Sequence, residues 1–313
     1  MAKIAAVCIS EKKGTPKRPV ECAYFRENWG IEGDAHAGSW HRQISLLSKE
    51  KIDQFRADGA DVRDGDFGEN LIVEGLDLPA LPVGTRLQIG SGPVLLEISQ
   101  IGKDCHDHCA IYKRMGDCIM PREGIFAIVL KGGPVKAGDP LQVFAPEAGR
   151  PYTAAVLTLS DKGSRGQRRD ESGPLMEKLL QEAGYDVKES LLLSDDPEPL
   201  ERELIRLADQ RRVDVIFTSG GTGFSPRDNT PEATAAVCDR MAPGIAQALT
   251  AYSMSITPRA MFSRAVSGIR RQTLIINLPG SPKAVQESLD YLLPLLGHGL
   301  DILRGTGGEC ARH

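Results

Sequence analysis

A glycine-rich loop at residues 220–223 carries the strongest chemical signal in the sequence. The apolar run at 213–217 has the length of a buried strand, and three glycines follow it within four positions. Thr230 then predicts a helix N-cap, with Pro231 at the first helical position. Glycine lets backbone N–H groups approach a bound anion, and a helix N-terminus attracts phosphate. The order of strand, glycine loop and helix therefore predicts a phosphate-binding site.

Two charged residues, Arg227 and Asp228, lie between the glycines and this helix. Arg227 can pair with a phosphate group. Asp228 would repel phosphate unless a hard cation lies between them, so the pair predicts a bound Mg²⁺ ion. The plain alternative is a glycine-rich turn after a core strand, because short glycine motifs often occur without a ligand.

Strands and helices alternate through the second half of the chain. Strands are predicted at 153–159, 187–193, 213–217 and 273–278, and helices begin near residues 173, 200, 231 and 282. Alternation predicts parallel strands with right-handed crossovers, in a three-layer α/β/α domain with a mostly parallel sheet at residues 152–304. The glycine-rich residues 305–313 are predicted to form a flexible tail.

Residues that could bind a ligand follow each predicted strand. Ligands of an open parallel sheet bind at the carboxyl ends of its strands, so these loops should converge. After the four strands come, in order, Ser160 and Asp161, then Asp195 and Asp196, then the glycine loop, then Pro279, Gly280 and Ser281. Asp161 fits either a ligand contact or a plain strand-end cap.

The second half resembles the molybdopterin adenylyltransferase family. The matching motifs are Gly-Gly-Thr-Gly at 220–223, Arg227-Asp228, Thr-Pro-Glu-Ala-Thr at 230–234, and the segments at 256–264 and 277–280. The resemblance implies transfer of AMP from Mg-ATP to the terminal phosphate of molybdopterin, with release of pyrophosphate. It also implies a homotrimer.

The resemblance assigns roles to individual residues. The two aspartates that the family needs for this step fall on Asp195 and Asp228, which would also hold Mg²⁺; Asp196 is the alternative to Asp195. The residues expected to bind ATP or molybdopterin are Ser160, Asp161, Ser219, Gly220, Gly221, Thr222, Gly223, Arg227, Ser263, Arg264, Pro279, Gly280 and Ser281.

The first half, residues 1–146, has short strand-like runs separated by glycine and proline. The runs lie at 4–9, 43–47, 71–73, 86–89, 94–99, 126–130 and 140–143, with one helix predicted at 48–58. This pattern predicts a mainly β, barrel-like domain. The Pro- and Gly-containing residues 146–151 are expected to form a linker.

This half resembles a MOSC domain, a β-rich module that handles molybdenum cofactor or sulfur. The matching segments include 30–38, 43–47, 65–71 and 135–139. The resemblance implies a functional cysteine after the strand that ends at Gln100, which is Cys105. Its thiolate would be a nucleophile or sulfur carrier. His36 and His41, near Asp34 and Arg42, suit either a polar pocket for the cofactor's phosphate or satisfied loop positions.

The cysteines near residue 105 leave other interpretations open. Cys105, Cys109 and Cys118, with a neighbouring histidine, could form a zinc site, or they could be ordinary thiols. Asp104 should raise the pKa of the Cys105 thiol, whereas Lys103 and His106 should lower it.

The composition excludes several classes of protein. A formal net charge of −4 over 313 residues gives no electrostatic case for nucleic-acid binding. The sequence has no run of about 18 apolar residues that would span a membrane, and no signal peptide is expected at the N-terminus. Seven cysteines, an odd number, predict reduced thiols in the cytoplasm.

The sequence thus predicts a bifunctional protein of molybdenum cofactor assembly. The C-terminal half would adenylylate molybdopterin, and the N-terminal half would bind the cofactor or its sulfur. Other cofactor-biosynthesis proteins or molybdoenzymes would be its partners. A carrier or sensor that binds pterin without turnover, and a different nucleotidyl transfer, are the alternatives.

Overall fold

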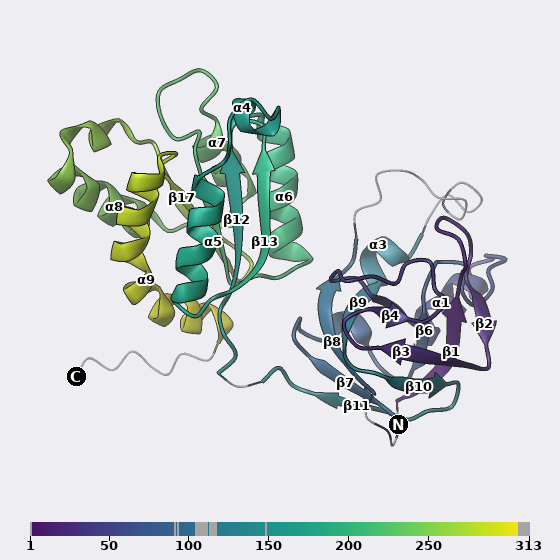
Figure 1. Cartoon of the computed structure of the whole chain (residues 1–313). Coiled ribbons are helices and arrows are strands. Elements are labelled where there is room, and N and C mark those ends of the chain that lie inside the picture. Colours follow the sequence, from purple (N-terminus) through teal and green to yellow (C-terminus); the bar gives the residue numbers. More distant parts are fainter. Residues whose placement is uncertain are drawn as a thin grey trace. The chain divides into compact units, whose positions relative to one another are not determined.

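Figure 1 shows a computed structural model of the chain, which describes residues 2–90, 92, 94–103, 112, 118–147 and 149–305. The chain divides into two compact units, Met1–Arg150 and Pro151–His313. Cys105, Cys109 and residues 306–313 of the expected tail lie outside the described residues.

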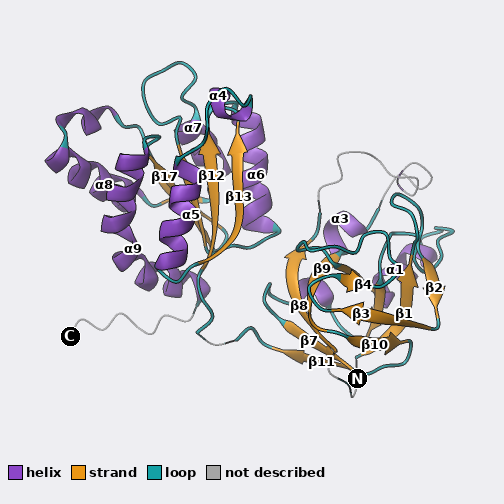
Figure 2. Ribbon diagram, in the orientation of Figure 1, coloured by secondary structure: helices purple, strands orange, loops and turns teal. Residues whose placement is uncertain are grey.

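The first unit is built on a curled sheet of eight strands (Figure 2). These strands are β1 (Lys3–Ile9), β2 (Arg18–Val20), β5 (Ile44–Ser48), β6 (Leu71–Glu74), β7 (Arg86–Ile89), β8 (Val94–Ile101), β9 (Ile125–Lys131) and β11 (Leu141–Phe144). Their order is β11-β7-β8-β9-β5-β6-β1-β2. Within the described part of this sheet, only β5 and β6 pair in parallel.

A second, smaller sheet and several short helices complete the first unit. The sheet has the order β10-β3-β4, formed by β3 (Cys22–Arg26), β4 (Gly30–Ile31) and β10 (Gly133–Lys136). The helices include α1 (Lys49–Ala57), η1 (Leu78–Ala80) and α3 (Met120–Glu123). Helix α1 confirms the helix predicted at 48–58, and the two-residue and three-residue strands were not predicted.

The large sheet curls far enough for its β1 and β11 strands to meet. Lys3 and Pro140 form an isolated antiparallel bridge, and the Ile4 N–H donates to Asp139 O at 2.9 Å. Side chains from both sheets, including Phe25, Leu46 and Leu96, fill the interior. The mainly β architecture is therefore as expected, while a closed barrel remains a prediction.

The second unit is a six-stranded sheet between two layers of helices. Its strands are β12 (Thr153–Leu159), β13 (Asp186–Leu193), β14 (Val215–Ser219), β15 (Arg240–Met241), β16 (Ser267–Arg270) and β17 (Thr273–Leu278). The order is β13-β12-β14-β17-β16-β15. The first four strands are parallel, and β16 and β15 add antiparallel pairs that the sequence analysis missed.

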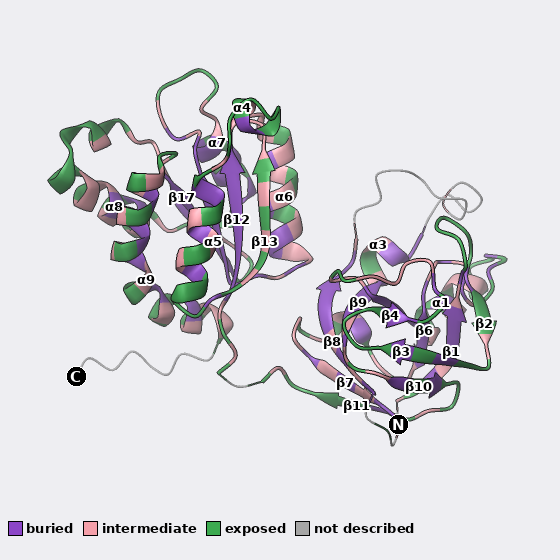
Figure 3. Ribbon diagram, viewed as in Figure 1, coloured by how far each residue is buried: buried purple, intermediate pink, exposed green. Residues whose placement is uncertain are grey.

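The helices of this unit divide between the two faces of the sheet. They are α4 (Asp161–Ser164), α5 (Ser172–Glu182), α6 (Pro197–Asp209), α7 (Thr230–Val237), α8 (Pro243–Ile256), η2 (Pro258–Phe262) and α9 (Pro282–Arg304). Phe217 of β14 packs with α5, α8 and α9, whereas the adjacent Ile216 packs with α6 and α7. This alternation makes β14 buried on both faces, as is its neighbour β12 (labelled in Figure 3).

The described helices include none with the length and apolar character that crossing a bilayer requires.

Candidate functional site

The loops at the carboxyl ends of the four parallel strands meet, as expected for an open α/β sheet. The Asp161 N–H donates to Asp195 Oδ2 at 2.9 Å, which joins the loop after β12 to the loop after β13. The Ser219 hydroxyl donates to Pro279 O at 2.9 Å, which joins the ends of β14 and β17. The predicted residues of all four loops therefore share one edge of the sheet.

The glycines after β14 are required by the backbone. Gly220 and Gly221 have φ of 100° and 64°, in the left-handed region that glycine tolerates best. A Cβ on Gly220 would lie 2.5 Å from Leu159 O, and one on Gly221 would overlap Thr230 Oγ1. The loop thus passes too close to β12 and α7 for any larger residue.

Thr230 does not cap α7, so that prediction was wrong. Asn229 occupies the N-cap position, and Thr230 is the first helical residue. The Thr230 hydroxyl instead donates to Gly220 O at 2.9 Å, and its N–H donates to Gly221 O at 3.1 Å. Gly220 is buried, so its carbonyl oxygen needs a hydrogen-bond donor, and the Thr230 hydroxyl supplies it.

Arg227 bridges two acidic loops. Its guanidinium bonds both carboxylate oxygens of Asp161 at 2.9 Å, and it lies 2.9 Å from Asp196 Oδ1. Hydrogen bonding to Arg227 lowers the pKa of Asp161, and hydrogen bonds from Ser194 and Arg227 lower the pKa of Asp196. Both acids are therefore held ionised by a cation that the chain itself supplies.

Asp195 and Asp228 have different surroundings from these two acids. Burial raises the pKa of Asp195 and the nearby charges of Asp161 and Asp228 add to this effect, while the Asp161 N–H and the charge of Arg227 oppose it. Asp228 Oδ2 accepts the Ser225 N–H at 3.0 Å. Among the described residues, neither carboxylate contacts a cationic side chain. These two half-buried acids are therefore the ones that an added cation would neutralise.

This arrangement fits Mg²⁺ held jointly with substrate phosphates. Mg²⁺ is usually bound through one or two carboxylates, water and phosphate oxygens rather than by a full protein cage. Within the described part of the chain, no group of three or more His, Cys, Asp or Glu side chains could hold a metal ion by itself. Two acids at a glycine loop are consistent with that mode of binding.

A cavity of about 310 Å³ adjoins the same loops. The Thr158 hydroxyl on its wall is buried and has no hydrogen-bond partner within the described structure. Arg168 and Arg169 line it from the loop before α5. Asp170, one residue before the N-cap Glu171, accepts the Ser172 and Gly173 N–H groups at 3.0 and 3.1 Å. The remaining polar lining residues are Ser160, Glu171, Ser219 and Ser281. The cavity therefore offers hydroxyl groups, arginines and acids to a polar ligand.

Arg264 lies against the glycine loop, and Ser263 precedes it in the chain. The Arg264 N–H donates to Thr222 O at 2.8 Å, and its Nε donates to Gly223 O at 2.7 Å. The Ser263 hydroxyl accepts the Ala265 N–H at 3.3 Å.

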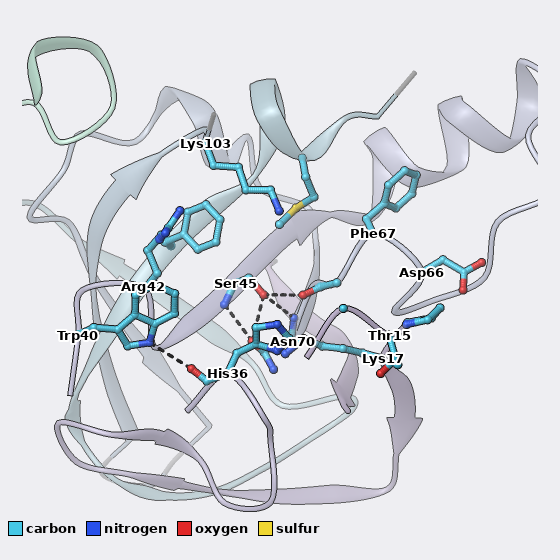
Figure 4. Close-up of a pocket in the computed structure, with 15 residues that line it drawn as sticks. Thr15, Lys17, His36, Trp40, Arg42, Ser45, Asp66, Phe67, Asn70 and Lys103 are labelled. Atoms are coloured by element: carbon cyan, nitrogen blue, oxygen red, sulfur yellow. Dashed lines mark hydrogen bonds between the residues drawn. The ribbon is translucent and has the colours of Figure 1, made fainter. Parts of the chain in front are cut away.

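The first unit has a pocket of its own, with a volume of about 320 Å³ (Figure 4). Phe67, Met120 and Phe126 give it an apolar wall. Arg42 stacks between Trp40 and Phe126, with its guanidinium carbon 4.8 and 5.6 Å from the ring centres. Other cationic or polar lining residues are Thr15, Lys17, His36, Ser45, Asn70 and Lys103, and the acid among them is Asp66. Cationic groups and aromatic rings suit a ligand that has a flat apolar part and an anionic group.

A buried ion pair supports one side of this pocket. Lys17 Nζ lies 2.6 Å from Asp34 Oδ2, and both side chains are at most 2% exposed. Burial alone would raise the pKa of Asp34, but the His36 hydrogen bond and the Lys17 charge outweigh it and lower that pKa. Asp34 also accepts the Ser10 and His36 N–H groups at 3.0 and 2.9 Å. The acid organises this side of the pocket through these contacts.

Of the two histidines predicted from the sequence to suit a polar pocket, only His36 lines the pocket described above. Its Nδ1 lies 3.6 Å from Asp34 Oδ1. His41 Nε2 instead lies 2.9 Å from Gln100 Oε1. Cys118 is buried beside Met120 in an apolar cluster, and no zinc site is found among the described residues.

Two family models match the chain. The one for the probable molybdopterin binding domain matches residues 155–298, and the one for the MOSC domain matches residues 32–142. Among solved structures, the molybdopterin biosynthesis enzyme MoaB from Thermus thermophilus aligns at 42% identity with a TM-score of 0.48. That alignment covers 50% of this chain and 98% of that chain.

Curated relatives extend this similarity. The molybdopterin adenylyltransferase of Escherichia coli strain K12 is 38% identical over 138 residues, which cover 43% of this chain and 70% of that protein. The molybdopterin adenylyltransferase of Helicobacter pylori strain 26695 is 38% identical over 153 residues, or 48% of this chain and 87% of that protein. The chain belongs to the molybdopterin adenylyltransferase family. It is accordingly a nucleotidyltransferase, and its family functions in molybdenum cofactor biosynthesis.

The structure groups most of the residues that the family resemblance had named. Asp161, Asp195, Arg227 and the glycine loop are linked by the contacts described above, and Pro279 and Gly280 lie against Ser219 and Gly220. Arg264 also joins this group, although its guanidinium is directed at backbone carbonyl groups.

Several residues that line the two cavities were missed. In this member of the adenylyltransferase family they are Thr158, Arg168, Arg169 and Asp170 in the second unit, and Thr15, Lys17 and Lys103 in the first. The charged residues 168–171, Arg-Arg-Asp-Glu, stand directly before the Ser-Gly-Pro start of a predicted helix. This run of charges at a helix N-terminus could have indicated a polar binding site. The role of Lys17 could not be predicted from its neighbours in the sequence, because its buried partner Asp34 is 17 residues away.

Proposed function

We propose that the second unit transfers AMP from ATP to the terminal phosphate of molybdopterin, with Mg²⁺ bound at Asp195 and Asp228. The observation that carries this proposal is a pair of half-buried acids that form no ion pair with a cationic side chain among the described residues, at the same edge of the sheet as the glycine loop. Membership in the adenylyltransferase family supports the same reaction.

The transfer joins two polyanions. An oxygen of the molybdopterin phosphate forms a bond to the α-phosphorus of ATP. The bond from that phosphorus to the bridging oxygen breaks, and pyrophosphate leaves with the electron pair. Such a reaction needs charge neutralisation and in-line positioning more than covalent help from the protein. Magnesium bound at the two acids would supply positive charge to the departing pyrophosphate.

The chain's own groups have separate tasks in this proposal. Backbone N–H groups at 221–223 bind phosphate oxygens, while the Gly220 N–H donates to Leu278 O at 3.3 Å; glycine allows the close approach. Arg227 is 49% exposed, so it can exchange its carboxylate partners for a substrate phosphate. The cavity at Thr158 and Ser160 binds the polar part of a substrate, and Ser263 contributes from the η2 side. These contacts hold both substrates in line.

For the first unit, we propose binding of the molybdenum cofactor or its sulfur in the pocket at Arg42. The cationic groups Arg42, Lys103 and His36 would bind an anionic group of the cofactor, and Trp40 would contact its ring system. Cys105 follows the pocket residue Lys103 by two positions and would be the sulfur carrier or ligand. Molybdoenzymes or other cofactor-biosynthesis proteins would receive the cofactor.

We further propose, from the family resemblance and the odd number of cysteines, that the second unit forms a homotrimer and that the protein acts in the cytoplasm.

Pyrophosphate release tests the proposed reaction. The intact chain is incubated with ATP, molybdopterin and Mg²⁺, and pyrophosphate is measured alongside binding of each substrate. We expect release that requires all three, and near-complete loss of turnover with the fold retained in Asp228→Asn. Binding of both substrates without release would favour the alternative of a carrier or sensor. Unchanged turnover in Asp228→Asn would contradict the role of that residue.

A further inference from the structure

Arg264 makes an unusual set of contacts for a residue expected to bind substrate. It lies between η2 and β16, and its side chain is about one-third exposed. Its Nε donates to Gly223 O at 2.7 Å, a terminal nitrogen donates to Asp228 O, and the other terminal nitrogen pairs with Glu232 at the start of α7. Each nitrogen of the guanidinium is therefore already engaged within the protein.

These contacts lie at both ends of one short segment. Residues 223–228 connect the glycine turn to α7 and carry both Arg227 and Asp228. Four of the six, Phe224 to Arg227, are exposed. Within the segment, the described hydrogen bonds are local ones among Ser225, Arg227 and Asp228. The Arg227 side chain ties the segment to Asp161 and Asp196, but it makes no contact with the Asp228 backbone. The attachment to the rest of the unit at the Asp228 backbone therefore comes from Arg264.

We propose that Arg264 is a positioning residue that sets the place of the Asp228 carboxylate by holding the carbonyl groups of Gly223 and Asp228. The proposal rests on the proposed function only in assigning Mg²⁺ to Asp228. Arg264 acts through the loop backbone and does not contact substrate. This replaces the ligand-contact role that the family resemblance suggested for it.

The shape of the guanidinium explains why arginine is needed here. Its planar fork directs several N–H donors to fixed, separated acceptors, whereas a lysine ammonium is a single compact charge. Arg264→Lys keeps the positive charge but cannot reach Gly223 O, Asp228 O and Glu232 together. Glu232→Gln is the matched control, because it removes the ion pair and leaves both carbonyl contacts in place.

Amide hydrogen exchange measures how firmly Arg264 holds the segment at residues 223–228, without any need for turnover. The informative amides are those of Ser225, Asp228 and Thr230, which donate to Asp228 Oδ2, Ser225 O and Gly221 O. In Arg264→Lys we expect these amides to exchange about tenfold faster, a change equivalent to about 1.4 kcal/mol. The amides of β14 should keep their rates, which also shows that the unit is folded. Glu232→Gln should exchange as the unmodified chain does.

Magnesium titration of pyrophosphate release provides the second readout. In Arg264→Lys we expect the Mg²⁺ concentration for half-maximal turnover to rise about tenfold, with KM for ATP and molybdopterin changed less than about twofold at saturating Mg²⁺. Unchanged exchange at the three amides would overturn the proposal. So would a rise in KM for either substrate with an unchanged Mg²⁺ requirement, because that result identifies a direct substrate contact. If the unmodified chain releases no pyrophosphate, the proposed function fails, and the exchange rates alone decide the role of Arg264.

Discussion

Asp195 and Asp196 are adjacent in the sequence and have opposite environments. Burial raises the pKa of Asp195, and the acid forms no ion pair with a cationic side chain among the described residues, although the charge of Arg227 acts on it from a distance. Asp196 is 51% exposed, pairs with Arg227, and accepts the Ser194 hydroxyl at 2.9 Å. A sequence pattern could not separate the two, because both follow the same strand. Their surroundings favour Asp195 as the residue that binds the cation.

Replacement of each acid by asparagine tests this assignment. Asp195→Asn should reduce pyrophosphate release by at least about 100-fold, because one of the two carboxylates proposed to bind Mg²⁺ is lost. Asp196→Asn should reduce it less than about tenfold, since only an exposed pair with Arg227 is lost. Steady-state kinetics at saturating Mg²⁺ measure both. Equal losses in the two variants would contradict the assignment.

Glu69 is a buried acid of the first unit whose charge is poorly compensated. It is 0% exposed; its Oε1 accepts the Gly65 N–H at 2.7 Å, and its Oε2 has no partner within the described structure. Burial raises its pKa to about 7 from the ordinary value of 4.5. The folded state therefore holds this proton more tightly than the unfolded state does.

This pKa predicts a specific dependence of stability on pH. Its contribution to stability is complete below about pH 4.5 and is lost as the pH rises through about 7, by on the order of 3 kcal/mol. Glu69→Gln should abolish that decline, while Glu74→Gln at a partly exposed position should leave it unchanged. Urea unfolding followed by fluorescence suits the measurement, because both tryptophans, Trp29 and Trp40, lie in the first unit. The same decline in Glu69→Gln would refute the assignment.

At the scale of elements, the glycine loop depends on close backbone contact more than on flexibility. Gly220 and Gly184 both have positive φ, of 100° and 82°. A Cβ at Gly220 would meet Leu159 O at 2.5 Å, whereas a Cβ at Gly184 would meet nothing within 4 Å. The difference between the two sites is therefore steric.

Alanine substitution at Gly184 and Gly220 distinguishes the cost of a positive φ from the cost of a steric clash. Gly184→Ala should lower the free energy of unfolding by about 1–2 kcal/mol, the cost of a left-handed non-glycine residue, and leave ATP binding unchanged. Gly220→Ala should cost more, because β12 and β14 must also separate, and it should abolish ATP binding. Thermal unfolding and calorimetric ATP titration measure these effects. Equal losses at the two positions would show that close approach is unimportant.

The elements that the sequence predicted best are those with strong local patterns. The strands predicted at 153–159 and 273–278 coincide with β12 and β17, and Ser281 caps α9 by accepting the Ala284 N–H at 3.3 Å. The two-residue strands β4 and β15 were missed because their residues become strands only by pairing with β3 and β16.

The site could be predicted in outline for a topological reason. Once parallel strands are recognised, the residues after them must share one edge of the sheet, so Asp161, Asp195 and the glycine loop could be grouped. Contacts between distant segments could not be predicted in this way. Arg264 is 36 residues from Asp228, and no local pattern shows that its guanidinium would bind that backbone carbonyl.

At the scale of the whole molecule, each unit has its own core and its own kind of proposed anion site. The first unit presents arginine, lysine and histidine around an aromatic pocket. The second unit presents a glycine loop, one exposed arginine and two acids that favour an added cation. The net charge of −4 reveals neither, because it sums 38 basic and 42 acidic residues over the whole chain. In the proposed function, the first unit binds an anion of the cofactor directly, and the second unit binds ATP with the help of Mg²⁺.

The central claim is that the second unit binds ATP through Mg²⁺ held at Asp195 and Asp228. The most direct test is calorimetric ATP titration of the intact chain, with Mg²⁺ and with a chelator, repeated in Asp195→Asn/Asp228→Asn. The claim predicts at least about tenfold tighter binding with Mg²⁺ in the unmodified chain, and loss of that difference in the double variant. Equal affinity with and without Mg²⁺, or an undiminished Mg²⁺ effect in the double variant, would contradict it.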